Sequence, residues 1–179
     1  SEQELIVPIN ASEPSEIDDE LQDLFRKGFS TFKVKVGKDV QADIKRSNAI
    51  LKLLDGRGSI RLDANRAYSR DDAIRFANGI THSGVDLFEQ PCGADAWDDN
   101  AEVARNSPIP LMLDEPICSL RDIDRAADIP NVKFCKVKLK RFGGLEIDGE
   151  FDGRVDFNRY GRGICPLDNL VHYARCLIA

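Results

Sequence analysis

Charged residues recur at a nearly constant interval along this chain, each at the end of a short apolar run. They are Lys35, Asp63, Glu89, Asp114 and Lys138, separated by 28, 26, 25 and 24 residues. A β-strand, a loop, a helix and a return loop together need about that many residues. The interval therefore predicts a repeated βα unit, with these side chains at the carboxyl ends of parallel strands, where β/α barrels carry their chemistry.

Hydrophobic periodicity and turn residues define the elements between these strand ends. Strands are predicted over residues 5–9, 32–36, 60–63, 85–89, 109–114 and 132–138, and helices over residues 15–27, 39–54, 70–82, 96–105 and 120–127. Ser15, Ser69 and Ser119 each precede an aspartate by three residues, and such a pair satisfies free amides at a helix start. These serines therefore predict three helix N-termini.

The regular alternation ends at Gly143 and Gly144. Residues 145–162 are rich in Asp, Glu, Gly and Arg, with only a weak predicted strand near 154–157, and residues 167–178 are predicted to be helical. A complete eight-unit barrel needs about 250 residues, whereas this chain has 179. We therefore predict an incomplete α/β barrel of the TIM type, with six βα units in residues 1–144 and an irregular segment and closing helix in residues 145–179.

Composition and charge argue against several classes of protein. The formal net charge is −6, which disfavours a nucleic-acid-binding surface. No apolar run approaches the roughly 20 residues that span a bilayer, and residues 1–4 lack the basic start of a signal peptide. The five cysteines are odd in number and widely spaced, without a Cys-x-x-Cys pair. Reduced thiols in a cytoplasmic protein are therefore expected.

The charged strand ends suggest a metal site with an acid/base pair. Asp63, Glu89 and Asp114 supply acidic oxygen ligands from adjacent strands without a partnering histidine. Such a set favours a hard cation such as Mg²⁺, with Mn²⁺ as the alternative. Lys35 and Lys138 would lie on either side of that cation. The charges of the cation and of the other lysine lower the pKa of each lysine, as a general base near neutral pH requires.

Five short motifs, taken together and in this order, resemble the barrel domain of the enolase superfamily. They are Lys33-Val34-Lys35, Asp63-Ala64-Asn65, Glu89-Gln90-Pro91, Asp114-Glu115-Pro116 and Lys138-Leu139-Lys140-Arg141-Phe142-Gly143-Gly144. The resemblance covers roughly residues 4–145. It is greatest to the muconate-lactonizing-enzyme subgroup of the mandelate racemase/muconate lactonizing enzyme family, which includes o-succinylbenzoate synthases and dipeptide epimerases.

The resemblance implies a site and a reaction. The implied roles are Lys35 and Lys138 as the acid/base pair, Asp63, Glu89 and Asp114 as the Mg²⁺ ligands, and Lys33 and Asn65 as supporting residues near the metal and the substrate carboxylate. The implied reaction removes a proton α to the carboxylate of a small molecule through an enediolate. It gives epimerisation or racemisation, cycloisomerisation or dehydration, and a divalent cation stabilises the enediolate.

Departures from the family's pattern leave alternatives open. The family's N-terminal capping domain is not expected here, because the chain opens at the first predicted strand, and an incomplete barrel would expose strand edges. A homo-oligomer would cover such edges, and the irregular residues 145–162 favour a non-catalytic remnant that serves as an interaction module. A Schiff-base lysine aldolase would use Lys138 but would leave Asp63, Glu89 and Asp114 unexplained.

Overall fold

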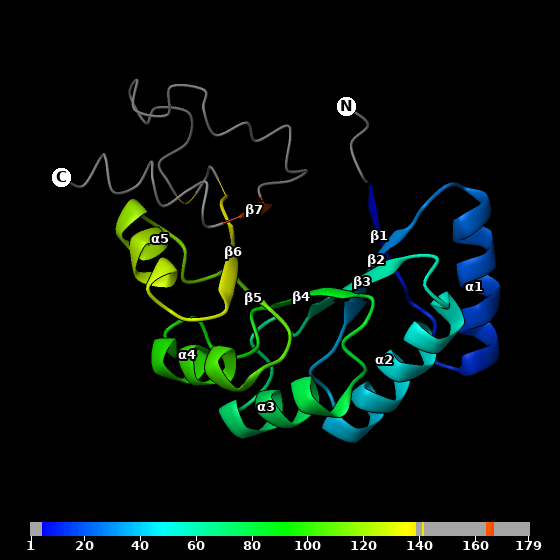
Figure 1. The fold of residues 1–179 in the computed structure, drawn as a ribbon, viewed down its shortest axis with the longest axis horizontal. Coiled ribbons are helices and arrows are strands. Elements are labelled where there is room, and N and C mark those ends of the chain that lie inside the picture. Colours follow the sequence, from blue (N-terminus) through cyan, green and yellow to red (C-terminus); the bar gives the residue numbers. More distant parts are fainter. Residues whose placement is uncertain (1–4, 139–140, 142–163, 167–179) are drawn as a thin grey trace.

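The computed structural model describes residues 5–138, 141 and 164–166, and it shows one curved sheet with helices along its outside (Figure 1). Within these residues the sheet has seven strands in the order β1 to β7. The strands are β1 (Ile6–Pro8), β2 (Thr31–Lys35), β3 (Ser59–Asp63), β4 (Val85–Glu89), β5 (Leu111–Leu113), β6 (Val132–Lys136) and β7 (Ile164–Pro166). Strands β1 to β6 are parallel, whereas β7 runs antiparallel to β6.

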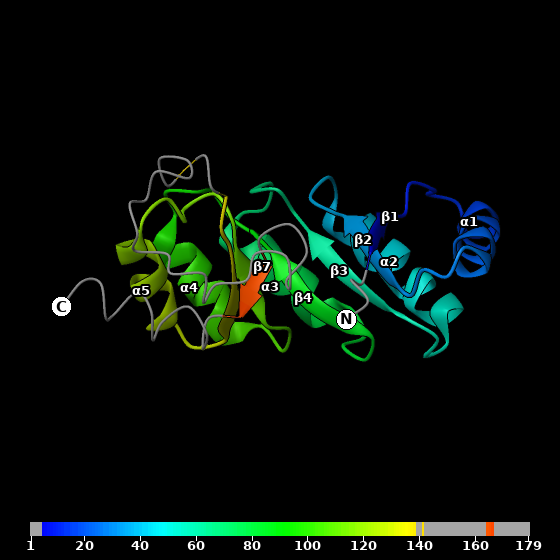
Figure 2. The ribbon, with the colours of Figure 1, turned by 90° about the horizontal axis from the view of Figure 1, so that it is seen from above.

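A helix follows each of the first five strands (Figures 1 and 2). The helices are α1 (Pro14–Arg26), α2 (Val40–Leu54), α3 (Arg70–Gly79), α4 (Trp97–Asn106) and α5 (Leu120–Ala127). Helices α1, α2 and α3 each contact the next helix in the chain. In the ranges that the structure describes, no helix is both long enough and apolar enough to cross a membrane. The alternation of parallel strands and helices confirms the α/β class predicted from the interval.

The predicted helix starts are confirmed at two of the three serines. The Ser69 and Ser119 side chains each accept a hydrogen bond from the backbone amide three residues later, and they cap α3 and α5. The prediction at Ser15 is wrong, because α1 begins one residue earlier and includes Ser15. Pro14 stands in the first turn of α1, where its fixed φ angle and missing N–H suit a helix start without a capping side chain.

Two of the strands, β5 and β6, end before the charged residues that were predicted to close them. Strand β5 ends at Leu113 and β6 ends at Lys136, so Asp114 and Lys138 lie in the loops that follow. The sequence pattern does not predict β7. Strands β1 and β7 are the edges of the described sheet, and they are not paired with each other. The predicted strand near 154–157, the helix over 167–178 and the domain boundary at 144 lie outside the described residues.

Alternation along the strands separates an apolar outer face from a charged inner face. On β2, Phe32 and Val34 are fully buried in the core with residues of the helices, whereas Lys33 between them is partly exposed. On the outer side Phe76 of α3 packs against Phe88 of β4, with 5.3 Å between the ring centroids. The helices therefore fix the sheet from outside, and the charged side chains of the strand ends lie on its inner face.

Candidate metal and acid/base site

The parallel register brings the charged strand ends next to one another. Lys35 pairs with Asp63, and Asp63 pairs with Glu89, in the ladder of β2, β3 and β4. Strands β5 and β6 continue the sheet; Asp114 directly follows β5, and Lys138 lies two residues after the end of β6. The five recurring residues therefore lie along one rim of the sheet, which the carboxyl ends of its strands form.

The Lys33 ammonium joins the first two carboxylates of this rim. Its Nζ atom lies 2.7 Å from Asp63 Oδ2 and 2.9 Å from Glu89 Oε2. Burial alone would lower the pKa of Lys33, but its hydrogen bonds and charge interactions with the two carboxylates outweigh burial and raise the pKa above its usual value. Lys33 therefore stays a cation near neutral pH, and it is unsuited to act there as a general base.

Lys136 makes a second bridge, although the sequence pattern did not predict this residue as part of the site. Its Nζ atom lies 2.6 Å from Glu89 Oε1 and 3.5 Å from Asp114 Oδ2. Both oxygens of Glu89 consequently face an ammonium group, one from β2 and one from β6. The signal that could identify Lys136 is its spacing of two residues from Lys138, because alternate residues along an extended chain share a face.

Asp114 is held by two further cations at the start of its loop. Lys138 Nζ lies 2.7 Å from Asp114 Oδ2, and the Arg141 guanidinium lies 2.8 Å from Oδ1 and also donates to the Asp114 carbonyl oxygen. Burial alone would raise the pKa of Asp114, but the hydrogen bond from Lys138 and the three nearby positive charges hold it below its usual value. Arg141, like Lys136, was not predicted from the sequence as part of the site.

Gln90 fixes the relative position of β4 and β5 at this rim. Its buried side chain accepts a hydrogen bond from the Asp114 backbone amide and donates one to the Cys92 carbonyl oxygen, each at 2.9 Å. Gln90, Asn65 and Arg66 have φ angles of 38°, 45° and 70°. Such positive angles are uncommon for residues other than glycine and concentrate at functional sites, where the surrounding structure holds the strain.

Asn65 and Lys35 occupy different surroundings. Asn65 approaches Asp63 through its backbone amide, which donates to Asp63 Oδ1 at 2.9 Å. Lys35 is exposed at the end of β2 and lines a cavity of about 530 Å³ together with residues of α2 and of the loop between β1 and α1. The structure therefore brings together Lys33, Asp63, Glu89, Asp114 and Lys138 through direct ion pairs, while Lys35 lies beside them, opposite Asp63 in the ladder.

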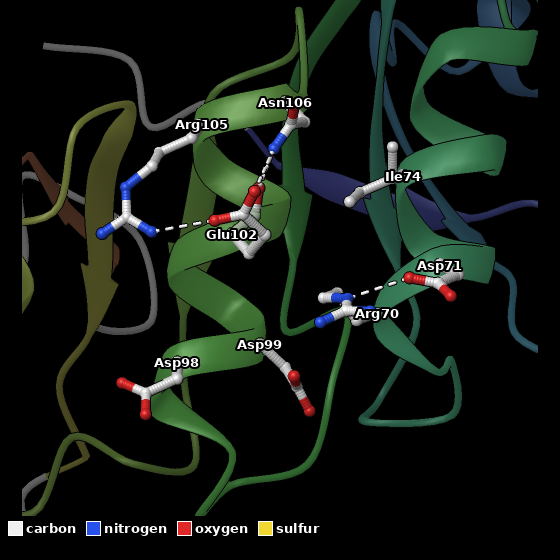
Figure 3. A pocket seen from close by; sticks show the side chains of 8 residues that line it. All are labelled: Arg70, Asp71, Ile74, Asp98, Asp99, Glu102, Arg105 and Asn106. Atoms are coloured by element: carbon white, nitrogen blue, oxygen red, sulfur yellow. Dashed lines mark hydrogen bonds and ion pairs between the residues drawn. The ribbon is translucent and has the colours of Figure 1, made fainter.

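A second cavity, of about 620 Å³, lies between α3 and α4 on the outside of the sheet (Figure 3). Its charged side chains largely pair within their own helices, Arg70 with Asp71 on α3 and Arg105 with Glu102 on α4. None of the predicted site residues lines this cavity. It is therefore distinct from the rim formed by the strand ends.

The donor chemistry of the rim fits a hard divalent cation. Asp63, Glu89 and Asp114 are carboxylates from three neighbouring strands, and oxygen atoms of all three face positive charge. Carboxylate oxygens are the ligands that Mg²⁺ prefers. Within residues 5–138, 141 and 164–166, however, no three His, Cys, Asp or Glu side chains lie close enough together to hold a metal ion. In this structure the carboxylate oxygens of these three residues contact ammonium and guanidinium groups instead.

Taken together, the alternating β/α sheet and the charged rim at its strand ends place the chain in the class of β/α-barrel-type domains. The sequence family described as enolase C-terminal domain-like matches residues 16–146. The chain belongs to this family, which confirms the resemblance that the five motifs carry.

Relatives of known activity share the same region. The L-Ala-D/L-Glu epimerase of Clostridium acetobutylicum is 33% identical over 141 residues, which are 78% of this chain and 39% of the relative. The o-succinylbenzoate synthase of Thermobifida fusca is 32% identical over 143 residues, 78% of this chain and 44% of the relative. The chain thus spans about two fifths of the length of these relatives.

A solved structure shares the fold. The dipeptide epimerase of Enterococcus faecalis V583, complexed with Mg and the dipeptide L-Leu-L-Tyr, superposes with a TM-score of 0.69 at 27% identity. The match covers 77% of this chain and 39% of that chain. This chain is therefore similar in sequence and fold to enzymes of the muconate-lactonizing type.

Proposed function

We propose that this chain carries the Mg²⁺-dependent proton-transfer site of a muconate-lactonizing-type enzyme, which acts on the carbon α to the carboxylate of a small molecule. The observation that carries the proposal is the line of Asp63, Glu89 and Asp114 on three neighbouring strand ends, with Lys138 directly on Asp114. Similarity to epimerases and to an o-succinylbenzoate synthase supports the reaction class.

Each residue that the sequence predicts for the site has a role in this proposal. Asp63, Glu89 and Asp114 would hold Mg²⁺, or Mn²⁺ in its place, and the bound ion would supply positive charge that stabilises the enediolate form of the substrate. Lys33, which its two carboxylates keep protonated, adds a fixed positive charge beside the substrate carboxylate. Asn65 supports Asp63 through the hydrogen bond of its backbone amide.

Lys138 and Lys35 would be the acid/base pair that removes and returns the proton of the substrate. Lys138 lies in the loop after β6 and Lys35 at the end of β2, on either side of the three carboxylates, so they can reach opposite faces of the α-carbon. One lysine removes the proton; the other returns a proton in epimerisation, or stays cationic while a leaving group departs in dehydration. Lys35 is exposed, and its four-carbon stem has the rotatable bonds that would turn its ammonium toward the inner face.

Calorimetric titration with Mg²⁺ tests the metal part of the proposal. The purified chain should bind Mg²⁺ saturably, and Glu89→Gln, which nearly keeps the side-chain shape, should weaken binding by about tenfold or more. Asp98→Asn is the matched control, because it removes the same charge from the exposed outer surface of α4. A folded chain that binds no Mg²⁺, or an equal loss in both variants, would contradict the proposed metal site.

Hydrogen exchange in D₂O tests the acid/base part. Dipeptides and N-succinyl amino acids serve as substrates, and the parent chain should exchange the α-proton of both enantiomers if it is an epimerase. Lys35→Met and Lys138→Met should then lose exchange with opposite enantiomers. If Lys138→Met exchanges as fast as the parent with every substrate, the proposed acid/base pair is refuted.

A further inference from the structure

Lys136 stands where a metal ion would have to bind. Its ammonium contacts Glu89 at 2.6 Å and reaches Asp114 at 3.5 Å, and both acids are proposed metal ligands. The Glu89 oxygen that Lys136 does not contact is held by Lys33 at 2.9 Å. A divalent cation on Glu89 would therefore share an oxygen with an ammonium group, and the like charges would repel each other strongly in this buried setting.

The charge balance of the rim permits the release of Lys136. Among the described residues, the rim joins three carboxylates to four cations in direct ion pairs: Asp63, Glu89 and Asp114 with Lys33, Lys136, Lys138 and Arg141. The departure of Lys136 leaves three cations for three carboxylates. Glu89 then keeps Lys33, and Asp114 keeps both Lys138 and Arg141. No carboxylate is stranded without a partner.

The departure of Lys33 would be less favourable. Lys33 is the cation that bridges Asp63 and Glu89 through two short contacts, 2.7 and 2.9 Å, and its loss would leave Asp63 without that bridge. Lys136 makes one short contact and one long one. Its flexible four-carbon stem starts on the inner face of β6, where the side chain is partly exposed.

We propose that Lys136 is a resident cation that competes with the divalent metal for Glu89 and Asp114. In the metal-free protein it neutralises these two carboxylates, and metal binding requires its ammonium to swing away from Glu89. The inference rests on the proposed metal site. It adds that the affinity of this site is set by a side chain that is not itself a metal ligand.

Titration of Mg²⁺ into Lys136→Met tests the competition, because methionine keeps most of the stem and removes the charge. The variant should bind Mg²⁺ about tenfold more tightly than the parent, since no ammonium has to be displaced. Lys133→Met is the control: it removes the same charge from the same strand at an exposed position. The control should change the affinity less than about twofold, as expected for a screened surface charge.

Thermal unfolding provides a readout that does not depend on the titration. With EDTA present, Lys136→Met should unfold at a lower temperature than the parent, because Glu89 loses one of its two ammonium partners. Excess Mg²⁺ should then raise the unfolding midpoint of the variant more than that of the parent. If Lys136→Met does not fold, Lys136→Gln is measured in the same way.

The outcomes separate this inference from the proposed function. Tighter Mg²⁺ binding by Lys136→Met that is lost in the double variant with Glu89→Gln supports both the metal site and the competition by Lys136. Binding that is equal to or weaker than that of the parent overturns the role of Lys136 and leaves the metal site intact. An absence of Mg²⁺ binding by the parent, by Lys136→Met and by Lys136→Gln overturns the metal site itself and the competition with it.

Discussion

Removal of the Tyr68 hydroxyl tests how the loop after β2 is held next to the site. Asp43, in the first turn of α2, accepts three hydrogen bonds at one carboxylate oxygen, Oδ2. They come from the Tyr68 hydroxyl at 2.6 Å and from the backbone amides of Gly37 and Lys38 at 2.8 and 3.1 Å. Asp43 is 8% exposed and Tyr68 is 6% exposed. These bonds connect the loop that follows Lys35 to α2, which carries Asp43, and to the segment before α3, which carries Tyr68.

The expected cost of Tyr68→Phe follows from this geometry. A hydrogen bond to a charged group contributes about 1.5–3 kcal/mol, and Phe keeps the ring contact with Phe76, whose centroid lies 5.4 Å away. No cavity contribution is therefore added. For a chain of this size the unfolding midpoint should fall by about 3–12 °C. Urea unfolding, followed by circular dichroism and by the fluorescence of Trp97, measures the free energy directly.

A double-mutant cycle with Asp43→Asn identifies the partner of the hydroxyl. The two changes should be less than additive, because each one removes the same charged hydrogen bond. A free energy of unfolding for Tyr68→Phe within about 0.5 kcal/mol of the parent would refute the reasoning. So would an additive cycle, since the hydroxyl would then not act through Asp43.

The pH dependence of stability provides a second check on Tyr68. Burial, together with the hydrogen bond to Asp43, raises the pKa of Tyr68 above its usual value of 10.0. The folded state then holds this proton more tightly than the unfolded state. The stabilisation is complete below about pH 10 and is lost progressively at higher pH. Tyr68→Phe should therefore lose less stability than the parent between neutral and strongly alkaline pH.

Two further predictions concern parts of the fold away from the rim. Asn131 has a φ angle of 65°, and its amide nitrogen lies within 3.1 Å of three carbonyl oxygens at the end of α4 and in the loop before β5. Asn131→Ala should lower the free energy of unfolding by about 2–4 kcal/mol, and Asn131→Gly should recover the backbone part; equal losses would contradict the contribution of the φ angle. Cys118 is exposed, whereas Cys92 and Cys135 are buried, and burial raises the pKa of Cys92 to about 12. Iodoacetamide at pH 8, followed by peptide mass spectrometry, should label Cys118 about tenfold faster than Cys92, and similar rates would contradict the burial of Cys92.

Local features of the sequence were sufficient to predict most of the sheet. Each βα unit needs a minimum length of chain, so the spacing of strand-end charges such as Asp63 and Glu89 predicts parallel neighbours. The starts of α3 and α5 were predictable because Ser69 and Ser119 act on an amide only three residues away. The same pattern failed at Ser15, where the fixed φ angle of the preceding proline sets the start of α1.

Contacts between distant strands could not be predicted in the same way. The bridge from Lys136 to Glu89 depends on the reach of a flexible side chain across β5, and the ladder shifts register between Leu111 and Met112 on that strand. The antiparallel pairing of β7 with β6 places Ile164 opposite Lys136, which the spacing of the strand ends does not predict. The positions of Asp63, Glu89 and Asp114 on neighbouring strand ends were therefore predictable from the order of the βα units along the chain. The side chains that neutralise these carboxylates were not predictable in this way.

The ion pairs of the rim also bear on the order in which the chain folds. Lys33 and Glu89 are 56 residues apart in the sequence, and Lys136 and Glu89 are 47 apart. Neither pair can form before the strands that lie between them have docked, because the closure of such long loops costs entropy that only the assembled sheet repays. We expect these charges to pair late in folding. Salt should then change the rate of unfolding more than the rate of folding, and stopped-flow kinetics in which only the folding rate responds would contradict this order.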